Sequence, residues 1–411
     1  MKKTGLNKWL ILFIICIGGG IIYIFPYLQY TYYDSMMSAL GLDNTQMGTL
    51  ISVYGMLNLV AYFFGGIVAD RFQPKNLLTF SLVGTGLTGF IFATYPPYSV
   101  MLLLSVVWSI TTTFTYWPAM MKAVKLLGSS EEQGRLFGFR EALFSVLALV
   151  FSGIGLFVFN RTGENFKMLV ITYSVIYCVC GVITFFFLPK ATNDGMQEQE
   201  EKHSPVEGLG YVLKQPNVWL VGLIIFCAYA VGITLGRITP YLTNVFQMGV
   251  STAAVVSIIN EYAIGTIGSA VGGVASDKLK SSTRCLKYCF ILMAVLLAAF
   301  VAIPGVPQFL MFAIVFGLST KLMQAATRGI YFVPLDEIKV PDNYVGTAVG
   351  VVSVIGFLSD AFLFTIWGKI MDAVPGVAGY KIMFGSLIGF CVVGLVLTVI
   401  LSKRIKALQG K

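Results

Sequence analysis

Charged residues are scarce in this chain: they make up 11% of 411 positions, whereas a soluble globular domain is typically about a quarter charged. Histidine occurs only at position 203, and the seven cysteines lie in or beside apolar runs. Neither a disulfide framework nor a metal-ligand pattern emerges. No phosphate-binding loop and no grouping of nucleophile, base and orienting residue is present. We therefore expect no soluble domain, no metal, no cofactor and no enzymatic activity.

Long apolar runs dominate the sequence instead, because hydrophobic residues make up 57% of the positions. Runs of roughly 18 to 25 residues have the length that a helix needs to cross about 30 Å of hydrocarbon. Backbone groups in lipid must be satisfied within the segment, which predicts helices. We expect twelve spans, at residues 9–30, 45–69, 77–95, 98–121, 137–159, 167–188, 217–245, 251–275, 286–303, 307–331, 346–368 and 380–402.

The net charge of +9 fits membrane topology better than a nucleic-acid partner. Lys2 and Lys3 precede the first span, and Lys403, Arg404 and Lys406 follow the last. Positive residues collect on the cytoplasmic side of membrane proteins. The pattern predicts a multi-pass protein of the inner (cytoplasmic) membrane, with both termini in the cytoplasm.

The two halves of the sequence repeat each other, which indicates a duplicated six-helix unit. Pro26-Tyr27-Leu28 recurs as Pro240-Tyr241-Leu242, and the glycine and aspartate that close the second span recur at the end of the eighth. A charged segment rich in turn-forming residues separates the halves. We predict an N-terminal bundle at 1–189, a cytoplasmic linker at 190–216 and a C-terminal bundle at 217–411.

The end of the second span reads Gly66-x-x-x-Asp70-Arg71. It resembles the Gly-x-x-x-Asp-Arg-x-Gly-Arg-Arg signature of major facilitator superfamily transporters and departs from it at Gln73 and Pro74. With the helix count, the linker and the repeat, the resemblance covers nearly the whole chain. It implies an all-α membrane protein with twelve transmembrane helices in two pseudo-symmetric six-helix bundles, working as a monomer.

The resemblance also implies gating contacts on the cytoplasmic side, made by Gly66, Asp70 and Arg71 and by their repeats Asp277 and Lys278. Small residues at positions 66 and 273 would let neighbouring helices approach closely. A purely topogenic role for the charges is the alternative. The cluster of Arg135, Arg140 and Glu141 at the start of the fifth span is open to two readings, gating salt bridges or interfacial solvation.

Five ionisable residues lie inside predicted spans of the second half, away from the first residues of those spans: Arg237, Glu261, Lys321, Arg328 and Asp360. Such residues are costly in a bilayer and mark functional sites. Three cations against two carboxylates leave one positive charge, which predicts an anionic substrate held by the cations. The two carboxylates are candidates for proton coupling. Structural bridges, Arg237 with Glu261 and Lys321 with Asp360, are the alternative.

The repeat places tyrosine opposite three of these charges, with Tyr23, Tyr54 and Tyr116 as the first-half partners. We expect these tyrosines and Trp117 to contact the rest of the substrate, although packing between helices is the alternative for the aromatic residues. Organophosphate antiporters of the superfamily typically pair arginines in spans 1 and 7. Tyr23 stands opposite Arg237 here, which favours a carboxylate or sulfonate.

The sequence thus predicts a secondary active transporter that moves a small organic anion by alternating access, with protons as the coupling ion. Two other functions stay open. Export of amphipathic drugs suits the aromatic and methionine content, and a membrane sensor would keep the same fold without moving its ligand.

Overall fold

The computed structural model describes residues 7–129, 132–190, 205–341 and 344–408, and these residues form helices and their connections without strands. The chain divides into two compact units. The first comprises residues 1–42 and 53–198, and the second comprises residues 43–52 and 199–411. The helix α4 therefore begins in the second unit and continues in the first.

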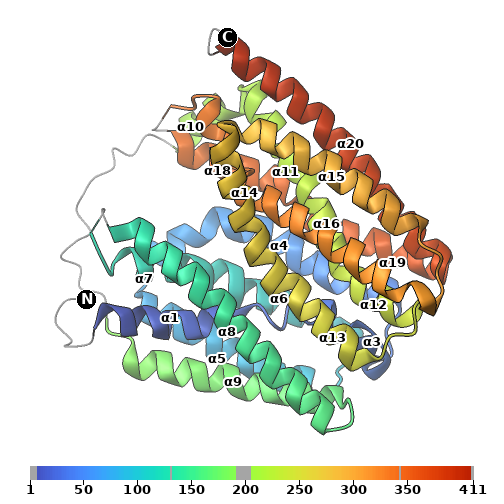
Figure 1. The fold of residues 1–411 in the computed structure, drawn as a ribbon. Coiled ribbons are helices and arrows are strands. Elements are labelled where there is room, and N and C mark those ends of the chain that lie inside the picture. The colour runs from blue at the N-terminus through green and yellow to red at the C-terminus, as the bar shows by residue number, and fades with distance from the viewer. Residues whose placement is uncertain (1–6, 130–131, 191–204, 342–343, 409–411) are drawn as a thin grey trace. The chain divides into compact units, whose positions relative to one another are not determined.

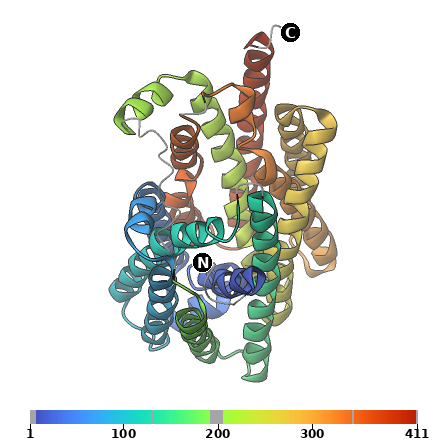
Figure 2. The same cartoon turned by 90° about the vertical axis from the view of Figure 1, so that its left-hand side faces the viewer.

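Helices of the first unit follow the six expected spans of that half. They are α1 (Lys8–Ile22), α2 (Leu28–Thr31), α3 (Tyr33–Leu40), α4 (Asn44–Arg71), α5 (Pro74–Phe92), α6 (Tyr98–Ser109), the π-helical η1 (Ile110–Tyr116), α7 (Trp117–Lys125), α8 (Gln133–Arg161) and α9 (Phe166–Phe187). In this unit α1 packs against α8, and α5 packs against α9 (Figures 1 and 2).

The second unit holds the other six spans and a helix before them. Its elements are α10 (Pro205–Leu213), α11 (Pro216–Thr234), η4 (Leu235–Arg237), α12 (Ile238–Asn244), α13 (Val250–Ile258), η5 (Ile259–Ile264), α14 (Gly265–Leu279), α15 (Ser282–Ala302), η6 (Pro307–Phe309), α16 (Leu310–Ile330), α17 (Pro334–Glu337), α18 (Val345–Gly356), η8 (Leu358–Ala361), α19 (Leu363–Ala373) and α20 (Val377–Leu408). Within it, α15 and α20 run side by side (Figure 1).

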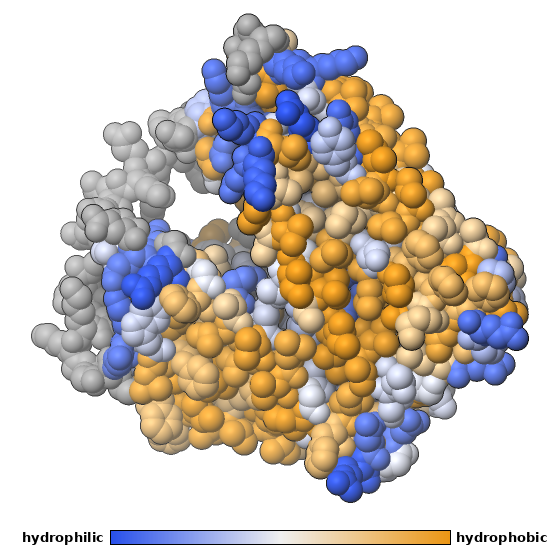
Figure 3. Space-filling view, viewed as in Figure 1, coloured by the Kyte–Doolittle hydropathy of each residue, from blue (hydrophilic) through white to orange (hydrophobic). Residues whose placement is uncertain are grey.

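The expected membrane class is confirmed by the helices themselves. Nine helical runs among the described residues are long and apolar enough to cross a membrane, and α1 is a shorter apolar helix. Large apolar side chains lie on the outside of these helices, for example Phe157 on α8 and Met311 on α16, which are 61% and 68% exposed. Figure 3 shows hydrophobic residues over the helix flanks and hydrophilic residues gathered at helix ends. Water would penalise such a surface, whereas lipid favours it.

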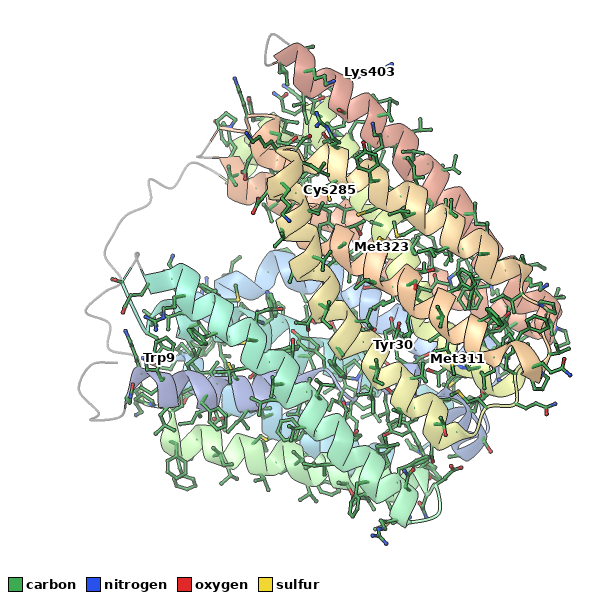
Figure 4. The ribbon with its side chains drawn as sticks, in the orientation of Figure 1. Trp9, Tyr30, Cys285, Met311, Met323 and Lys403 are labelled. Carbon is green, nitrogen blue, oxygen red and sulfur yellow. The ribbon has the colours of Figure 1, made fainter. Side chains whose placement is uncertain are left out.

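The first expected span is less regular than predicted. The helix α1 ends at Ile22, and α2 begins only at Leu28. Pro26 lies between them, and proline has no backbone N–H to continue a helix ladder. At the other end of α1, Trp9 packs edge-to-face on Phe139 of α8, with 5.1 Å between ring centroids (Figure 4).

Candidate functional site

Three of the five buried-charge candidates lie where a membrane-spanning helix departs from α geometry. Arg237 ends the 3₁₀ segment η4, Glu261 lies in the π-helical η5, and Asp360 lies in the 3₁₀ segment η8. Pro240 explains the first departure, because it cannot donate to the carbonyl four residues earlier. Such irregular turns are frequent at functional sites. All three belong to the second unit.

Arg237 is buried, with 3% of its surface exposed. Its guanidinium carbon lies 6.0 Å from the ring centroid of Phe364 on α19, within cation–π range. Thr234, one turn before Arg237, accepts at Oγ1 a hydrogen bond of 3.0 Å from Nε1 of Trp367 on α19. These contacts hold the η4 break against α19.

Asp360 is also buried, at 7% exposure, and contacts the same pair of spans. Its Oδ2 accepts a hydrogen bond from the Tyr229 hydroxyl on α11 at 2.8 Å. Its Oδ1 has no hydrogen-bond partner among the residues that the structure describes. One oxygen is thus held, while the other offers a place for a proton.

Lys321 on α16 forms an ion pair with Glu261, with 2.8 Å between Nζ and Oε2. The lysine side chain is 6% exposed and the glutamate side chain 29%. Lys321 therefore pairs with Glu261 rather than with Asp360, the partner considered from sequence. Glu261 therefore offsets the positive charge of Lys321 within the second unit.

Arg328 lies seven residues after Lys321, near the end of the same helix, and is exposed. The spacing places both on one side of α16, as expected.

Two of the predicted tyrosines lie deep inside the first unit, with their hydroxyl groups engaged. Tyr54 is 2% exposed and shares a hydrogen bond of 2.9 Å with Thr112 of η1. Tyr116 is 1% exposed and donates to the backbone carbonyl of Ile15 at 2.9 Å. These bonds fix α4 and α1 against the π-helical segment, so substrate contact by either tyrosine stays a prediction.

Tyr23 and Trp117 are half-buried and belong to one aromatic group of the first unit. Tyr23 packs on Phe144 with 6.4 Å between ring centroids. Trp117 lies beneath Arg140, whose guanidinium carbon is 4.9 Å from the indole centroid. Arg140 is only 6% exposed. The interfacial-solvation interpretation is therefore wrong for Arg140, which is buried among aromatic rings.

Close helix approaches do occur, but not at the two glycines expected from the loop motif. A Cβ added at Gly66 or Gly273 would meet nothing within 4 Å. At Gly272 it would lie 2.1 Å from the Ala326 carbonyl oxygen, and at Gly65 it would lie 2.9 Å from the Phe114 carbonyl oxygen. One residue is about 100° around a helix, so the preceding glycine faces the neighbour.

The charged gating residues are exposed where they are described. This applies to Arg71, Asp277 and Lys278, while the side chain of Asp70 lies outside the described part of the structure. Close to Arg71 in the chain, Ala69 accepts a hydrogen bond at its carbonyl from Nζ of Lys122 on α7, at 2.6 Å. A cation at the end of α4 complements the helix dipole. Gating by the motif stays a prediction.

A contact that sequence reasoning missed joins the start of α4 to α19 inside the second unit. Asp372 accepts from the backbone N–H groups of Asn44 and Thr45 at 3.2 and 2.8 Å, and from both of their side chains. It thereby caps four donors at a helix start. The backbones touch nearby, since a Cβ on Gly48 would lie 2.1 Å from the Phe364 carbonyl oxygen.

Metal chemistry has no visible support in the described ranges, where no group of three or more histidine, cysteine, aspartate or glutamate residues gathers. The seven cysteines are free, and six of them are buried. Cys285 on α15 is an example (Figure 4).

Comparison with known proteins agrees with this architecture. The model of the Major Facilitator Superfamily matches residues 9–363. The inner membrane protein YihN of Escherichia coli K12 is 34% identical over 407 residues, which cover 97% of this chain and 96% of YihN. The inner membrane protein YqcE of the same strain is 31% identical over 415 residues, which cover 99% of this chain and 97% of YqcE.

Among solved structures, a bacterial homologue of the human lysosomal transporter Spinster matches with a TM-score of 0.80 at 13% identity, over 98% of each chain. That likeness confirms the fold. The family match and the two relatives confirm the resemblance drawn from the loop motif and the repeat. The chain therefore belongs to the Major Facilitator Superfamily, a family of membrane transporters.

Proposed function

We propose that this protein is a proton-coupled secondary transporter of a small organic anion carrying a carboxylate or sulfonate group. The observation that supports the proposal most is the position of Arg237, which is buried at a helix break with its guanidinium over the Phe364 ring. A guanidinium binds planar oxyanions through paired hydrogen bonds and keeps its charge inside a protein.

The charge balance of the second unit favours an anion over a cation. Glu261 offsets Lys321 in a direct ion pair. The five candidate residues of this unit, three cations and two carboxylates, sum to one positive charge when both carboxylates are ionised. If Asp360 takes up a proton, the sum rises to two. The charge of an entering anion would therefore be offset by these residues whether or not Asp360 carries a proton.

Asp360 is the residue that we assign to the proton. It is buried, and Tyr229 holds one of its oxygens while the other has no hydrogen-bond partner in the described part of the chain. Its helix break packs on α11, the helix that leads into η4. Glu261 is the second candidate, although its carboxylate is already engaged in the ion pair with Lys321.

Alternating access is the transport mechanism that we propose. The bundles would be residues 1–189 and 217–411, joined by a cytoplasmic linker at 190–216, with both termini in the cytoplasm and a monomer as the working form. The breaks at η4, η5 and η8 supply local bends in membrane-spanning helices of the second bundle, and interrupted helices are where transporters bind substrates and ions.

Counterflow in proteoliposomes tests the substrate class. Vesicles loaded with one unlabelled compound from a panel of carboxylates, sulfonates, phosphate esters, nucleosides and amphipathic cations would be exposed to a trace of the same compound with a label. We expect exchange of a carboxylate or sulfonate, lost in Arg237→Ala and weakened in Arg237→Lys. The exposed Arg161→Ala, at the end of α8, serves as the matched control.

Exchange of only neutral or cationic compounds would contradict the anion assignment. Normal exchange by Arg237→Ala would show that the buried arginine is structural. Tight binding of an anion without any flux would favour the sensor considered from sequence.

A further inference from the structure

Arg140 on α8 is a buried cation in the first unit, the half of the chain in which sequence reasoning placed no buried charge. It is 6% exposed. Its guanidinium carbon lies 4.9 Å from the Trp117 centroid and 5.6 Å from the Phe144 centroid. Aromatic rings that cover the faces of a guanidinium leave its edges for hydrogen bonds in the plane.

The hydrogen bonds of this guanidinium are unevenly distributed. Nη1 forms an ion pair with Glu141, whose side chain is 62% exposed. Within the described ranges Nη2 donates only to the Met120 sulfur, at 3.7 Å, and thioether sulfur is a weak acceptor. Nε has no partner among the described residues. A buried donor without an acceptor costs free energy, so the arrangement favours an additional acceptor.

The two poorly satisfied donors, Nε and Nη2, form one edge of the guanidinium. This is the side-on edge that binds two oxygens of a carboxylate or sulfonate. We propose that Arg140, beside Trp117 and Phe144, is a second oxyanion-binding site, in the first unit, that takes a carboxylate or sulfonate group of a transported anion. As a substrate contact, it rests on the proposed function.

Neighbouring residues fit this role. Gly19 of α1 leaves room for Phe144, because a Cβ there would lie 3.2 Å from the phenylalanine ring. Tyr23 also packs on the Phe144 ring and is half-buried. Glu141 holds the remaining edge of Arg140 from the exposed side, which competes with a bound anion for the positive charge.

Binding is measured first without transport, through the quenching of tryptophan fluorescence in detergent by acetate, gluconate and isethionate. Trp117 lies directly beneath the guanidinium, so Trp117→Phe should remove the signal. We expect Arg140→Lys and Arg140→Gln to weaken binding roughly 10- to 100-fold, because lysine keeps the charge but loses the paired donors. Arg135→Gln, an exposed arginine on the same helix, should bind within about two-fold of the wild type.

Glu141→Gln provides a second variant, which keeps Arg140 in place and removes the negative charge paired with it. Removing the competing carboxylate should tighten binding, and unchanged or weaker binding would contradict the site. Binding by the Arg140 variants that equals that of Arg135→Gln, with the same elution profile and melting temperature, would overturn it as well.

Counterflow then separates this site from the proposed function. Anion exchange in the wild type that Arg140→Lys leaves unchanged would refute the site and keep the function. Anion binding that depends on Arg140 in a protein that exchanges no anion would keep the site and refute the function.

Discussion

The ion pair between Glu261 and Lys321 predicts that two substitutions, each harmful alone, are tolerated together. With 2.8 Å between the charged atoms, the Coulomb attraction is about 6 kcal/mol at an effective dielectric constant of about 20. Desolvating each ion costs several kcal/mol, which cancels much of that attraction. The pair as a whole therefore adds little stability, but either member left alone keeps its desolvation cost.

Lys321→Met alone should lower the free energy of unfolding by about 3–5 kcal/mol, because it leaves Glu261 without its cation. The double variant Glu261→Leu/Lys321→Met should be close to the wild type or more stable. The two single effects would then exceed the double effect by at least about 3 kcal/mol, well above the roughly 0.5 kcal/mol within which independent sites add.

Equilibrium unfolding of the four proteins in mixed detergent micelles measures this cycle, with tryptophan fluorescence and circular dichroism as independent probes of two-state behaviour. A cost below about 1 kcal/mol for Lys321→Met would refute the reasoning. Additive single effects would refute it equally, because they would show that the two side chains do not depend on each other.

Three further outcomes follow from local contacts. Gly272→Ala should cost about 1–3 kcal/mol of stability, because its Cβ would lie 2.1 Å from a backbone oxygen of α16, whereas Gly273→Ala, with open space, should be neutral in the same unfolding assay. Asp372→Ala should cost about 1 kcal/mol by uncapping the start of α4, and Asp372→Asn should recover part of the loss; equal stability of all three proteins would contradict the capping role. The hydrogen bond from Lys8 lowers the pKa of Glu132. The stability that this bond adds to the folded protein is therefore present above the unfolded pKa of about 4.3 and is lost as the pH falls through the lower folded pKa. Melting temperatures from pH 3 to 6 should show that loss in the wild type and a smaller one in Lys8→Ala.

The membrane spans were predictable because length and hydropathy determine them almost alone. The breaks within these helices were harder to predict from the sequence. Pro26 and Pro240 mark two breaks in the sequence, but the π-helical turn at Glu261 and the 3₁₀ turn at Asp360 have no such marker. They depend on packing against neighbouring helices, which composition does not reveal.

For the charged residues, too, the sequence predicted one part of the arrangement and only the fold gives the rest. Their cost in lipid identified Glu261 and Lys321 as important, but their pairing depends on the rotation of two helices about their axes. Arg140 lies inside an expected span, but close to its start, where the sequence favoured solvation and a gating salt bridge equally. The sequence contains the aromatic residues at positions 117 and 144, but it does not reveal that both rings lie against the Arg140 guanidinium. Only the fold brings them together.

Uptake of the exchanged anion into proteoliposomes with an imposed proton gradient, acidic outside, measures whether transport is coupled to protons. We predict accumulation above the external concentration, abolished when the gradient is collapsed. In Asp360→Asn, counterflow should persist while accumulation is lost, because exchange needs no net proton movement. Equal uptake with and without the gradient, or full accumulation by Asp360→Asn, would contradict the proposal that this protein couples proton entry to anion transport through Asp360.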